Sequence, residues 1–351
     1  MKKVRLGKPN TKMMLLVDKL TGAKSPNIII GPKPGVDVSV IRIDHRSVMI
    51  CSSDPVSLIP SLGPRLSARM SVYEVASDLA TSGVPPRYAM VDLNLPPELP
   101  DRTLEAYWKA FHETCLELGI SIVGGHTGRF EGCDYSVIGG ATLWATCNDD
   151  EYVTSTMAED GDEIVLTKSA GYGATSVLTR AFPKTVEKAI GPTLFESAWG
   201  YFHTSNTVKD SLVAAKAGLH ERGVTAMHDC TEGGVVAGLI ELATASRLGG
   251  TIDVDNIEVS EESREVCKFF RMEPMVSLGE GSLIITCNPK NTDKIMSKLA
   301  SGGIQSRIVG RLTSRFQGCK ANTGKGTRPL SYPRVDPYWK AYSGGIRKGW
   351  S

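Results

Sequence analysis

The sequence predicts a two-domain protein that mixes α-helices and β-strands, with an α/β arrangement in its second half. The chain has 351 residues, which is long enough for two domains with substantial cores. Apolar residues follow strand and helix periodicities in turn along both halves, and the acidic, polar stretch 148–161 lies between them. We therefore expect an N-terminal domain over residues 1–155, a C-terminal domain over residues 156–330 and an aromatic docking tail over residues 331–351.

The composition excludes several classes of partner. Lysine and arginine together number 40, and aspartate and glutamate 38, so a net charge of +2 favours neither nucleic acid nor an acidic membrane surface. The eight cysteines are dispersed without a Cys-x-x-Cys pair, which is typical of a reduced protein with buried thiols. No apolar run approaches the roughly 18 residues that span a bilayer. We expect a cytoplasmic protein that binds neither nucleic acid nor membrane.

Residues 1–35 precede the first strongly predicted strands. A short helix is expected near Thr11–Leu20, followed by the Gly/Pro-rich connector Gly31–Gly35. Lys8 and Lys33 are each long enough to contact a bound phosphate. The ordinary alternative for each is a solvated surface lysine.

The first strands are predicted as a hairpin. Val38–Ile43 is mostly β-branched, Val48–Cys51 is apolar, and the polar residues 44–47 between them suit a four-residue loop. A turn centred between His45 and Arg46 would pair residues whose numbers sum to 91.

That register places two carboxylates opposite each other. Asp37 would face Asp54, with Cβ atoms roughly 5 Å apart. Like charges at that distance repel unless a cation lies between them, and carboxylate oxygens suit Mg²⁺, which takes the rest of its ligands from water and phosphate. The alternative is that both are ordinary turn residues at strand ends.

A third carboxylate lies at the end of the next predicted element. Ser67–Ser82 has the i, i+3, i+4 spacing of an amphipathic helix, with glycine and proline after it. Asp78 falls in the last turn, where the helix dipole disfavours an anion. The metal expected at the hairpin would compensate Asp78, and pairing with Arg69 or Arg87 is the alternative.

The rest of the first half contains a glycine-rich segment after a strand. Ile120–Val123 reads as a short buried strand that runs into Gly124-Gly125-His126-Thr127, where backbone N–H groups can approach an anion. Glycine-rich turns after strands are common, and a single histidine is more often structural than catalytic. The other predicted elements here are the strands Tyr88–Leu95 and Tyr135–Thr146 and the helix Leu104–Leu118.

The second half carries acidic residues where packing does not need them. A strand from Val224 delivers Asp229, Thr231 and Glu232 to its carboxyl end, and a helix predicted over Gly234–Leu248 points its first N–H groups at the same place. The other predicted elements are Glu163–Thr167, Gly250–Val254, Ser282–Thr286 and Ser306–Leu312 as strands, with Thr207–Ala217, Glu261–Phe270 and Thr292–Ala300 as helices.

These pieces, in this order, resemble the aminoimidazole ribonucleotide (AIR) synthetase superfamily, also described as PurM-like. The superfamily includes the hydrogenase maturation protein HypE, selenophosphate synthetase, thiamine-phosphate kinase and formylglycinamidine ribonucleotide synthetase. The resemblance covers roughly residues 5–315 and looks closest to the HypE-like, AIR synthase-related branch. The matching motifs are Gly35-Val36-Asp37, Asp54-Pro55, Ser77 to Gly83, Gly124 to Thr127, Lys168 before a Gly-x-Gly loop, and Met227 to Gly234.

The resemblance implies a PurM-like fold, with an α+β N-terminal domain whose sheet pairs with that of a second subunit in a homodimer. A C-terminal α/β domain completes the fold, and ATP binds in the cleft. The residues implied to hold Mg²⁺ are Asp37, Asp54 and Asp78. The residues implied to contact the nucleotide are Gly124, Gly125, His126 and Thr127, with Lys8 as a further candidate.

The implied chemistry is ATP-dependent phosphoryl transfer to an amide-like or related oxygen of a small-molecule substrate. The transfer turns a poor leaving group into phosphate. The candidate catalytic residues on the substrate side are Asp229, Glu232 and Lys168. A partner protein is a further expectation.

The chain also departs from its relatives. HypE-type proteins end in a cysteine that carries the group being dehydrated, whereas the last cysteine here is Cys319. The cysteine or selenocysteine and the lysine expected near the start of a selenophosphate synthetase are missing, since the first cysteine is Cys51. Ser77 stands where an asparagine commonly precedes the helix aspartate. We expect ATP chemistry without the terminal-thiol step. The alternative is a nucleotide-binding accessory or scaffold protein without turnover, in a maturation or biosynthetic complex.

Overall fold

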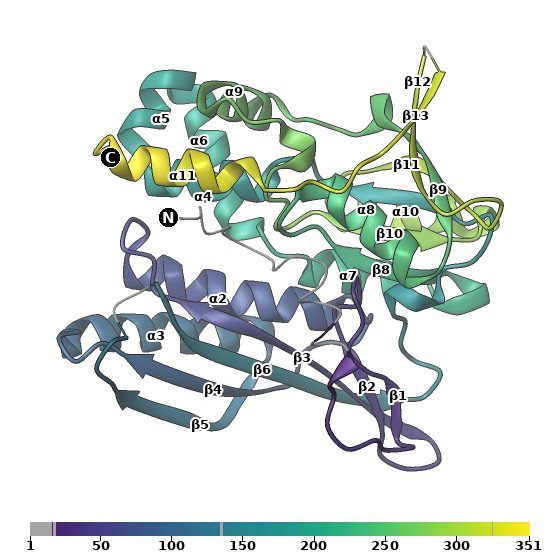
Figure 1. Cartoon of the computed structure of the whole chain (residues 1–351), viewed down its shortest axis with the longest axis horizontal. Helices are drawn as coiled ribbons and strands as arrows, with labels where there is room; N and C mark the ends of the chain where they lie inside the picture. Colours follow the sequence, from purple (N-terminus) through teal and green to yellow (C-terminus); the bar gives the residue numbers. More distant parts are fainter. Residues whose placement is uncertain (1–15, 17–18, 134–135, 325) are drawn as a thin grey trace.

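The computed structural model describes residues 16, 19–133, 136–324 and 326–351. It contains two β-sheets, each with its own helices, stacked one above the other (Figure 1). The expected short helix near residue 11 and the candidate phosphate contact Lys8 lie outside the described residues, apart from Leu16, Lys19 and Leu20. Among the described residues, no helix combines the length and apolar character needed to cross a membrane.

The first sheet has six strands in the order β1-β2-β3-β6-β4-β5. Only the β4–β5 pair is parallel, and the other neighbours are antiparallel. Its strands are β1 (Ile28–Ile30), β2 (Ser39–Arg42), β3 (Ser47–Ser57), β4 (Tyr88–Leu95), β5 (Ser121–Arg129) and β6 (Val137–Asn148).

Helices α2 (Gly63–Ala80) and α3 (Asp101–Leu118) cover one face of this sheet (Figure 1). The alternation of side chains along a strand explains the result. In β4, Ala89, Val91, Leu93 and Leu95 are buried under the helices, whereas Tyr88 and Met90 on the other face are 43% and 50% exposed. The sheet therefore has one packed face and one open face that carries large apolar side chains.

The predicted hairpin exists, but its predicted register is wrong by one residue. Ser39 pairs with Cys51 and Arg42 with Val48, so paired numbers sum to 90. The physical cause is the turn, in which the Asp44 carboxylate accepts hydrogen bonds from the backbone N–H groups of Arg46 and Ser47 and centres the turn on His45.

The register correction separates the expected cross-strand pair. Asp37 lies before β2 begins, and Asp54 lies on β3 opposite Ala141 of β6. β3 also continues through Pro55 to Ser57, beyond the predicted apolar run Val48–Cys51. Proline has no backbone N–H group to donate to a neighbouring strand. It is tolerated here because β2 pairs only with the first part of β3, so this side of β3 has no neighbouring strand at Pro55.

The glycine-rich segment is part of a strand, not the loop that the sequence predicted. Gly124 to Thr127 lie inside β5, at the edge of the sheet, and pair with residues 90–93 of β4. Gly125 has φ +146°, and a Cβ there would lie 1.8 Å from the carbonyl oxygen of Val91. The absence of a side chain at Gly125 therefore allows β5 to pair closely with β4 although the register shifts between them. As a result, β5 continues past residue 123.

The second sheet has seven strands in the order β13-β12-β9-β11-β7-β10-β8 and is mainly antiparallel, with β12 parallel to β9. Its strands are β7 (Glu163–Thr167), β8 (Val224–Asp229), β9 (Gly249–Asp253), β10 (Leu283–Cys287), β11 (Ser306–Thr313), β12 (Gly318–Thr323) and β13 (Gly326–Pro329). The predictions for Tyr88–Leu95, Glu163–Thr167 and the helix Glu261–Phe270 are confirmed in both bounds.

Helices cover both faces of this sheet, so its central strands are apolar without alternation. Ile164 and Leu166 pack with helix α8 on one face, and Val165 packs with α7 and α10 on the other. The helices of this half are α4 (Tyr172–Ala181), α5 (Pro183–Ile190), α6 (Pro192–Gly200), α7 (Val208–Ala215), α8 (Gly234–Ala245), α9 (Glu261–Phe270), α10 (Thr292–Ser301) and α11 (Pro337–Arg347).

The C-terminal helix α11 runs alongside the α4–α6 group, above α2 in the view of Figure 1. Its aromatic residues form an apolar cluster with residues of α4 and of the loop before α2. The ring of Phe182 is 5.7 Å from that of Tyr342 and 6.2 Å from that of Trp350. The Tyr342 hydroxyl lies 2.6 Å from that of Ser61. The helix thus contacts both halves of the chain.

Candidate functional site

Carboxylates from both halves of the chain converge where α2 meets β8. Asp78 in the last turn of α2 interacts electrostatically with Asp229, Asp54, Asp37 and Glu280. The structure therefore places two of the predicted metal ligands, Asp37 and Asp54, and the predicted catalytic residue Asp229 within electrostatic range of the third ligand, Asp78. The route differs from the predicted one, because the carboxylates meet around Asp78 and not across a strand pair.

The helix α2 contributes a second carboxylate to this cluster. Glu74 precedes Asp78 by four residues, so both project from the same face of the helix. Burial raises the pKa of Asp78 well above its usual value, and the charges of Asp229 and the other carboxylates raise it further. Burial and the neighbouring Asp54 likewise raise the pKa of Glu74. Burial first, and like charge second, therefore disfavour the ionised carboxylates of the cluster, and a bound cation would favour them.

No ion pair joins Asp78 to either proposed arginine in the part of the chain that the structure describes. Arg69 instead binds Glu117, with 2.6 Å between the guanidinium nitrogen and the carboxylate oxygen, and also the Tyr73 hydroxyl. Arg87 is exposed at the start of β4. The alternative in which an arginine compensates Asp78 is thus wrong for this structure.

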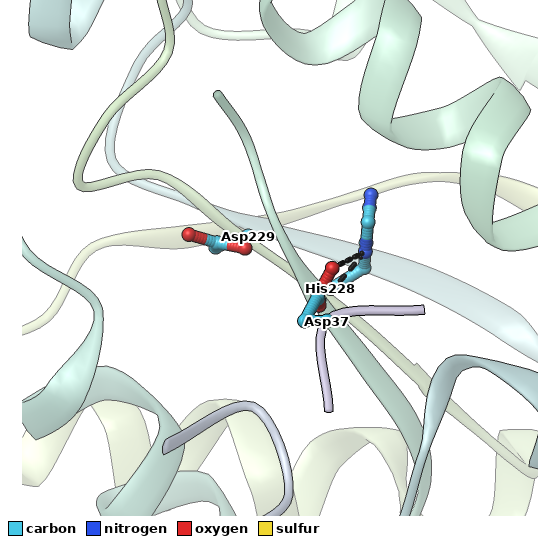
Figure 2. Close-up of side chains that lie close together, drawn as sticks. All are labelled: Asp37, His228 and Asp229. Carbon is cyan, nitrogen blue, oxygen red and sulfur yellow. Dashed lines mark hydrogen bonds and ion pairs between the residues drawn. The ribbon is translucent and has the colours of Figure 1, made fainter. Parts of the chain in front are cut away.

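A buried ion pair fixes Asp37. His228 on β8 lies with Nδ1 2.8 Å from one carboxylate oxygen of Asp37, and its Nε2 is 3.1 Å from Glu241 on α8. Although burial lowers the pKa of His228, the two carboxylates outweigh it and raise this pKa to about 10. Figure 2 shows the Asp37–His228 contact, with Asp229 leaving β8 in a different direction.

The group Asp37, His228 and Asp229 brings its ligand atoms within 4.8 Å of one another. A histidine must be deprotonated at the nitrogen that binds a metal. Both nitrogens of His228 face carboxylates, so it serves as an imidazolium that orients Asp37 and not as a ligand. The remaining donors are carboxylate oxygens, which suit Mg²⁺ better than a metal that prefers nitrogen or sulfur.

Glycines let the surrounding backbone approach the cluster closely. Gly35 has φ +75°, and a Cβ there would lie 2.5 Å from the carbonyl oxygen of Glu241, so this glycine allows the Asp37 segment to pack on α8. A Cβ at Gly173 would lie 2.6 Å from the backbone nitrogen of Glu280. The loop that carries Glu280 is therefore seated directly on α4.

Lys168 lies beside the cluster, with its ammonium group already bound. Its Nζ is 3.0 Å from the Asp210 carboxylate and donates hydrogen bonds to the backbone carbonyls of Gly281 and Asn206 at 2.5 and 3.0 Å. Its backbone is left-handed, with φ +56°. In this conformation Lys168 binds the backbone carbonyl of Gly281, the residue after Glu280. Its catalytic role stays a prediction.

The remaining predicted residues divide into two groups. Glu232 follows β8 in a loop and accepts a hydrogen bond from the Trp339 indole nitrogen at 3.2 Å. Gly124 to Thr127 lie on β5, the outermost strand of the first sheet, whereas Asp54 of the acidic cluster lies on β3, with β6 and β4 between the two strands. One chain alone does not bring these nucleotide-binding candidates to the carboxylates.

Sequence reasoning missed three participants. Glu74 was detectable from its i, i+4 relation to Asp78, which places both acids on one helix face. Glu280 stands between two glycines in Gly279-Glu280-Gly281, a pattern that favours close backbone approach. His228 was part of a quoted motif, but its two carboxylate partners lie 191 and 13 residues away. Such a contact is visible only in the fold.

Comparison with known proteins gives the family. The family described as AIR synthase related protein, N-terminal domain, matches residues 35–146, and that described as AIR synthase related protein, C-terminal domain, matches residues 159–318. The two matches together contain every predicted site residue except Lys8.

Three relatives are similar along most of their length. A putative hydrogenase expression/formation protein of Methanocaldococcus jannaschii is 24% identical over 277 residues, covering 77% of each chain. A selenide, water dikinase of Methanococcus maripaludis is 25% identical and covers 73% of this chain and 77% of its own. The carbamoyl dehydratase HypE of Escherichia coli is 25% identical, with 77% of each chain covered.

Solved structures share the fold. The HypE–HypF complex structure superposes with a TM-score of 0.70 at 16% identity, covering 92% of this chain and 100% of the matched one. Hydrogenase maturation protein HypE in complex with ATP gives a TM-score of 0.66 at 19% identity, covering 85% and 89%. At these identities the likeness concerns the fold alone.

Proposed function

Because the chain belongs to the AIR synthase related protein family, in its PurM-like, HypE-like branch, we propose that it is an enzyme that uses ATP and Mg²⁺ to activate an amide-like or related substrate oxygen by phosphoryl transfer. The observation that carries the proposal is the convergence of Asp37, Asp54, Asp78 and Asp229. Relatives named selenide, water dikinase and carbamoyl dehydratase, and the ATP complex of HypE, support the class of chemistry.

The metal is assigned to the first three of these carboxylates. Asp37, Asp54 and Asp78 would hold Mg²⁺, which neutralises charge on the phosphates when it is bound. The His228 imidazolium fixes the orientation of Asp37, and the rigid helix α2 fixes that of Asp78. Catalysis of this kind depends mainly on positioning and charge neutralisation, which a cluster on strands and helices can provide.

The substrate side is assigned to the loop after β8. Asp229 and Glu232, at the end of β8 and in the loop after it, would orient the substrate oxygen and accept or hold its proton. Lys168 would act from beneath the Glu280 loop, whose backbone it holds. In this proposal the first half of the chain binds ATP and the second half binds the substrate, so the two react between the halves.

A homodimer would complete the nucleotide site. Gly124 to Thr127 lie on an edge strand of a sheet whose open face exposes Tyr88, Met90 and Val123. Edge strands and apolar faces both favour association. A second copy of the chain would bury the apolar side chains of this open face, as α2 and α3 bury those of the opposite face. The structure of HypE with HypF supports a partner protein as a further proposal.

The experiment is a turnover screen. The protein is incubated with Mg²⁺ and ATP together with small carboxamides, thio-acids and amino-ribotides, and ADP is measured by chromatography. One substrate class should stimulate ADP formation, and Asp229→Asn should abolish the stimulation while the exposed control Asp255→Asn keeps it. Mg²⁺-dependent ATP binding without stimulation by any class would favour the scaffold alternative. Absence of ATP binding would contradict both.

A further inference from the structure

The segment that leads into α11 touches the loop that carries Glu232. We call residues 332–339 the C-terminal strap. The Asp336 carboxylate accepts a hydrogen bond from the backbone N–H of Gly233 at 2.8 Å, and the indole N–H of Trp339 donates to Glu232 at 3.2 Å. The strap lies beyond residue 318, where the family match ends.

A third contact joins the strap to the ion pair at the cluster. The Tyr332 hydroxyl donates to one carboxylate oxygen of Glu241 at 2.7 Å, and the other oxygen of Glu241 lies 3.1 Å from Nε2 of His228. The strap therefore contacts the substrate-side loop and also Glu241, the second carboxylate partner of the histidine that orients Asp37.

The strap is anchored through the helix that follows it. Asp336 is buried and also caps α11 by accepting the N–H of Tyr338 at 2.8 Å. Beyond it, Trp350 packs on Phe182, so the helix is held by apolar contact on α4. The contact to Glu232 thus comes from a rigid element and not from a free chain end.

The geometry points to Trp339 and Asp336 as positioning residues of the substrate-side loop. Glu232 is only partly buried and lies in a loop after β8, where several rotamers are accessible to its side chain. A hydrogen bond from the Trp339 indole selects one of them, and the Asp336–Gly233 bond fixes the backbone next to it. A loop residue can then hold substrate with the precision of a residue on a helix. This inference rests on the proposed function, in which Glu232 faces the substrate.

The test uses Trp339→Phe, which keeps the aromatic ring and removes the N–H donor. Trp350→Phe in the same tail is the matched control, because Trp350 contacts the aromatic cluster and not the loop. Mg²⁺-dependent ADP formation is measured in the full chain, together with amide hydrogen exchange of the peptide that covers residues 230–236. Both variants are repeated in a Glu232→Leu background, which removes the acceptor of the indole hydrogen bond.

We expect Trp339→Phe to lower kcat on the order of tenfold or more without changing KM for Mg²⁺-ATP, since only the substrate side is misplaced. Trp350→Phe should leave both constants unchanged. In the Glu232→Leu background, which has no acceptor for the indole N–H, Trp339→Phe should cause no further loss, because its effect passes through Glu232. A further loss there, or equal losses in the two tryptophan variants, would overturn the inference.

Failure of the proposed function gives a different result. A parent protein that forms no ADP under any condition contradicts turnover, and the strap is then judged from amide exchange alone. Faster exchange at residues 230–236 in Trp339→Phe than in Trp350→Phe supports positioning by the strap. Equal exchange in the two variants would overturn it.

Discussion

A carboxylate oxygen of Asp37 lies 2.8 Å from Nδ1 of His228, and this buried contact joins the two halves of the chain. Asp37 precedes β2 of the first sheet, and His228 lies on β8 of the second. Their side chains are 9% and 4% exposed, so the pair is largely removed from water. Because Glu241 binds the other nitrogen, one imidazolium serves two carboxylates. The contact fixes a candidate metal ligand and the relative placement of the halves together.

Removal of the imidazolium should destabilise the fold. His228→Leu leaves Asp37 and Glu241 buried without their cation, and breaking a buried pair in this way costs about 3–5 kcal/mol. Urea unfolding at pH 7 measures the loss. The control His45→Leu changes an exposed loop histidine and should stay within about 0.5 kcal/mol of the parent. Similar unfolding midpoints for parent and His228→Leu would show that the ion pair does not hold the halves.

The buried Asp336 should give stability a dependence on pH. Burial raises the pKa of Asp336 to about 6, above the unfolded value of about 3.9. The folded state therefore binds the Asp336 proton more tightly than the unfolded state does. The contribution of this proton to the free energy of unfolding is fully present below about pH 4 and is lost as the pH rises through 6. Asp336→Asn cannot titrate, and the parent-minus-variant difference should shrink by about 2 kcal/mol between pH 4 and 7. A difference that does not change with pH would contradict this prediction.

Most elements could be predicted because apolar periodicity decides them locally. β4, β7 and α9 were found in both bounds, since each is a clean apolar run or stripe between breakers. The hairpin register failed by one residue because the Asp44 side chain closed a different turn. Register depends on such turn details, and a shift of one residue changes every pairing.

The site was predictable where a residue type conflicted with its local setting. Asp78 in a helix C-terminal turn and Asp229 at a strand end both lacked a local reason, which pointed to a ligand. Glu74 and Glu280 gave only weaker signals, the i, i+4 spacing to Asp78 and the two flanking glycines, because an acid on a helix face or in a glycine loop is ordinarily solvated. Their role arises only when the fold brings α2 and the 279–281 loop together.

The open face of the first sheet should carry the dimer contact. Light scattering should give about twice the mass of one chain at micromolar concentration, and Met90→Arg should give a monomer, since Met90 lies 50% exposed on that face, on β4 beside the edge strand β5. The matched control Leu116→Arg adds the same charge at a 70% exposed position of α3 and should leave the dimer intact. A parent that scatters as a single chain would contradict the homodimer.

Without metal, the acidic cluster should cost stability. Burial and neighbouring carboxylates raise the pKa of Asp78, so its ionised form is disfavoured in the fold at pH 7. Asp78→Asn removes that charge and should raise the free energy of unfolding by about 1 kcal/mol in EDTA. The effect should disappear at low pH, where the parent carboxyl is also neutral. A loss of stability in EDTA would show that Asp78 is compensated by the protein itself.

The most direct measurement is calorimetric titration of Mg²⁺-ATP into the parent, Asp78→Asn, Asp54→Asn and the exposed control Asp255→Asn. If the carboxylates hold the metal, Asp78→Asn and Asp54→Asn each lose a ligand, and affinity should fall by on the order of a hundredfold or more, or about 3 kcal/mol. The fall should occur without loss of folding, and Asp255→Asn should bind like the parent. Mg²⁺-ATP binding by Asp78→Asn as tight as that of the parent would contradict the account.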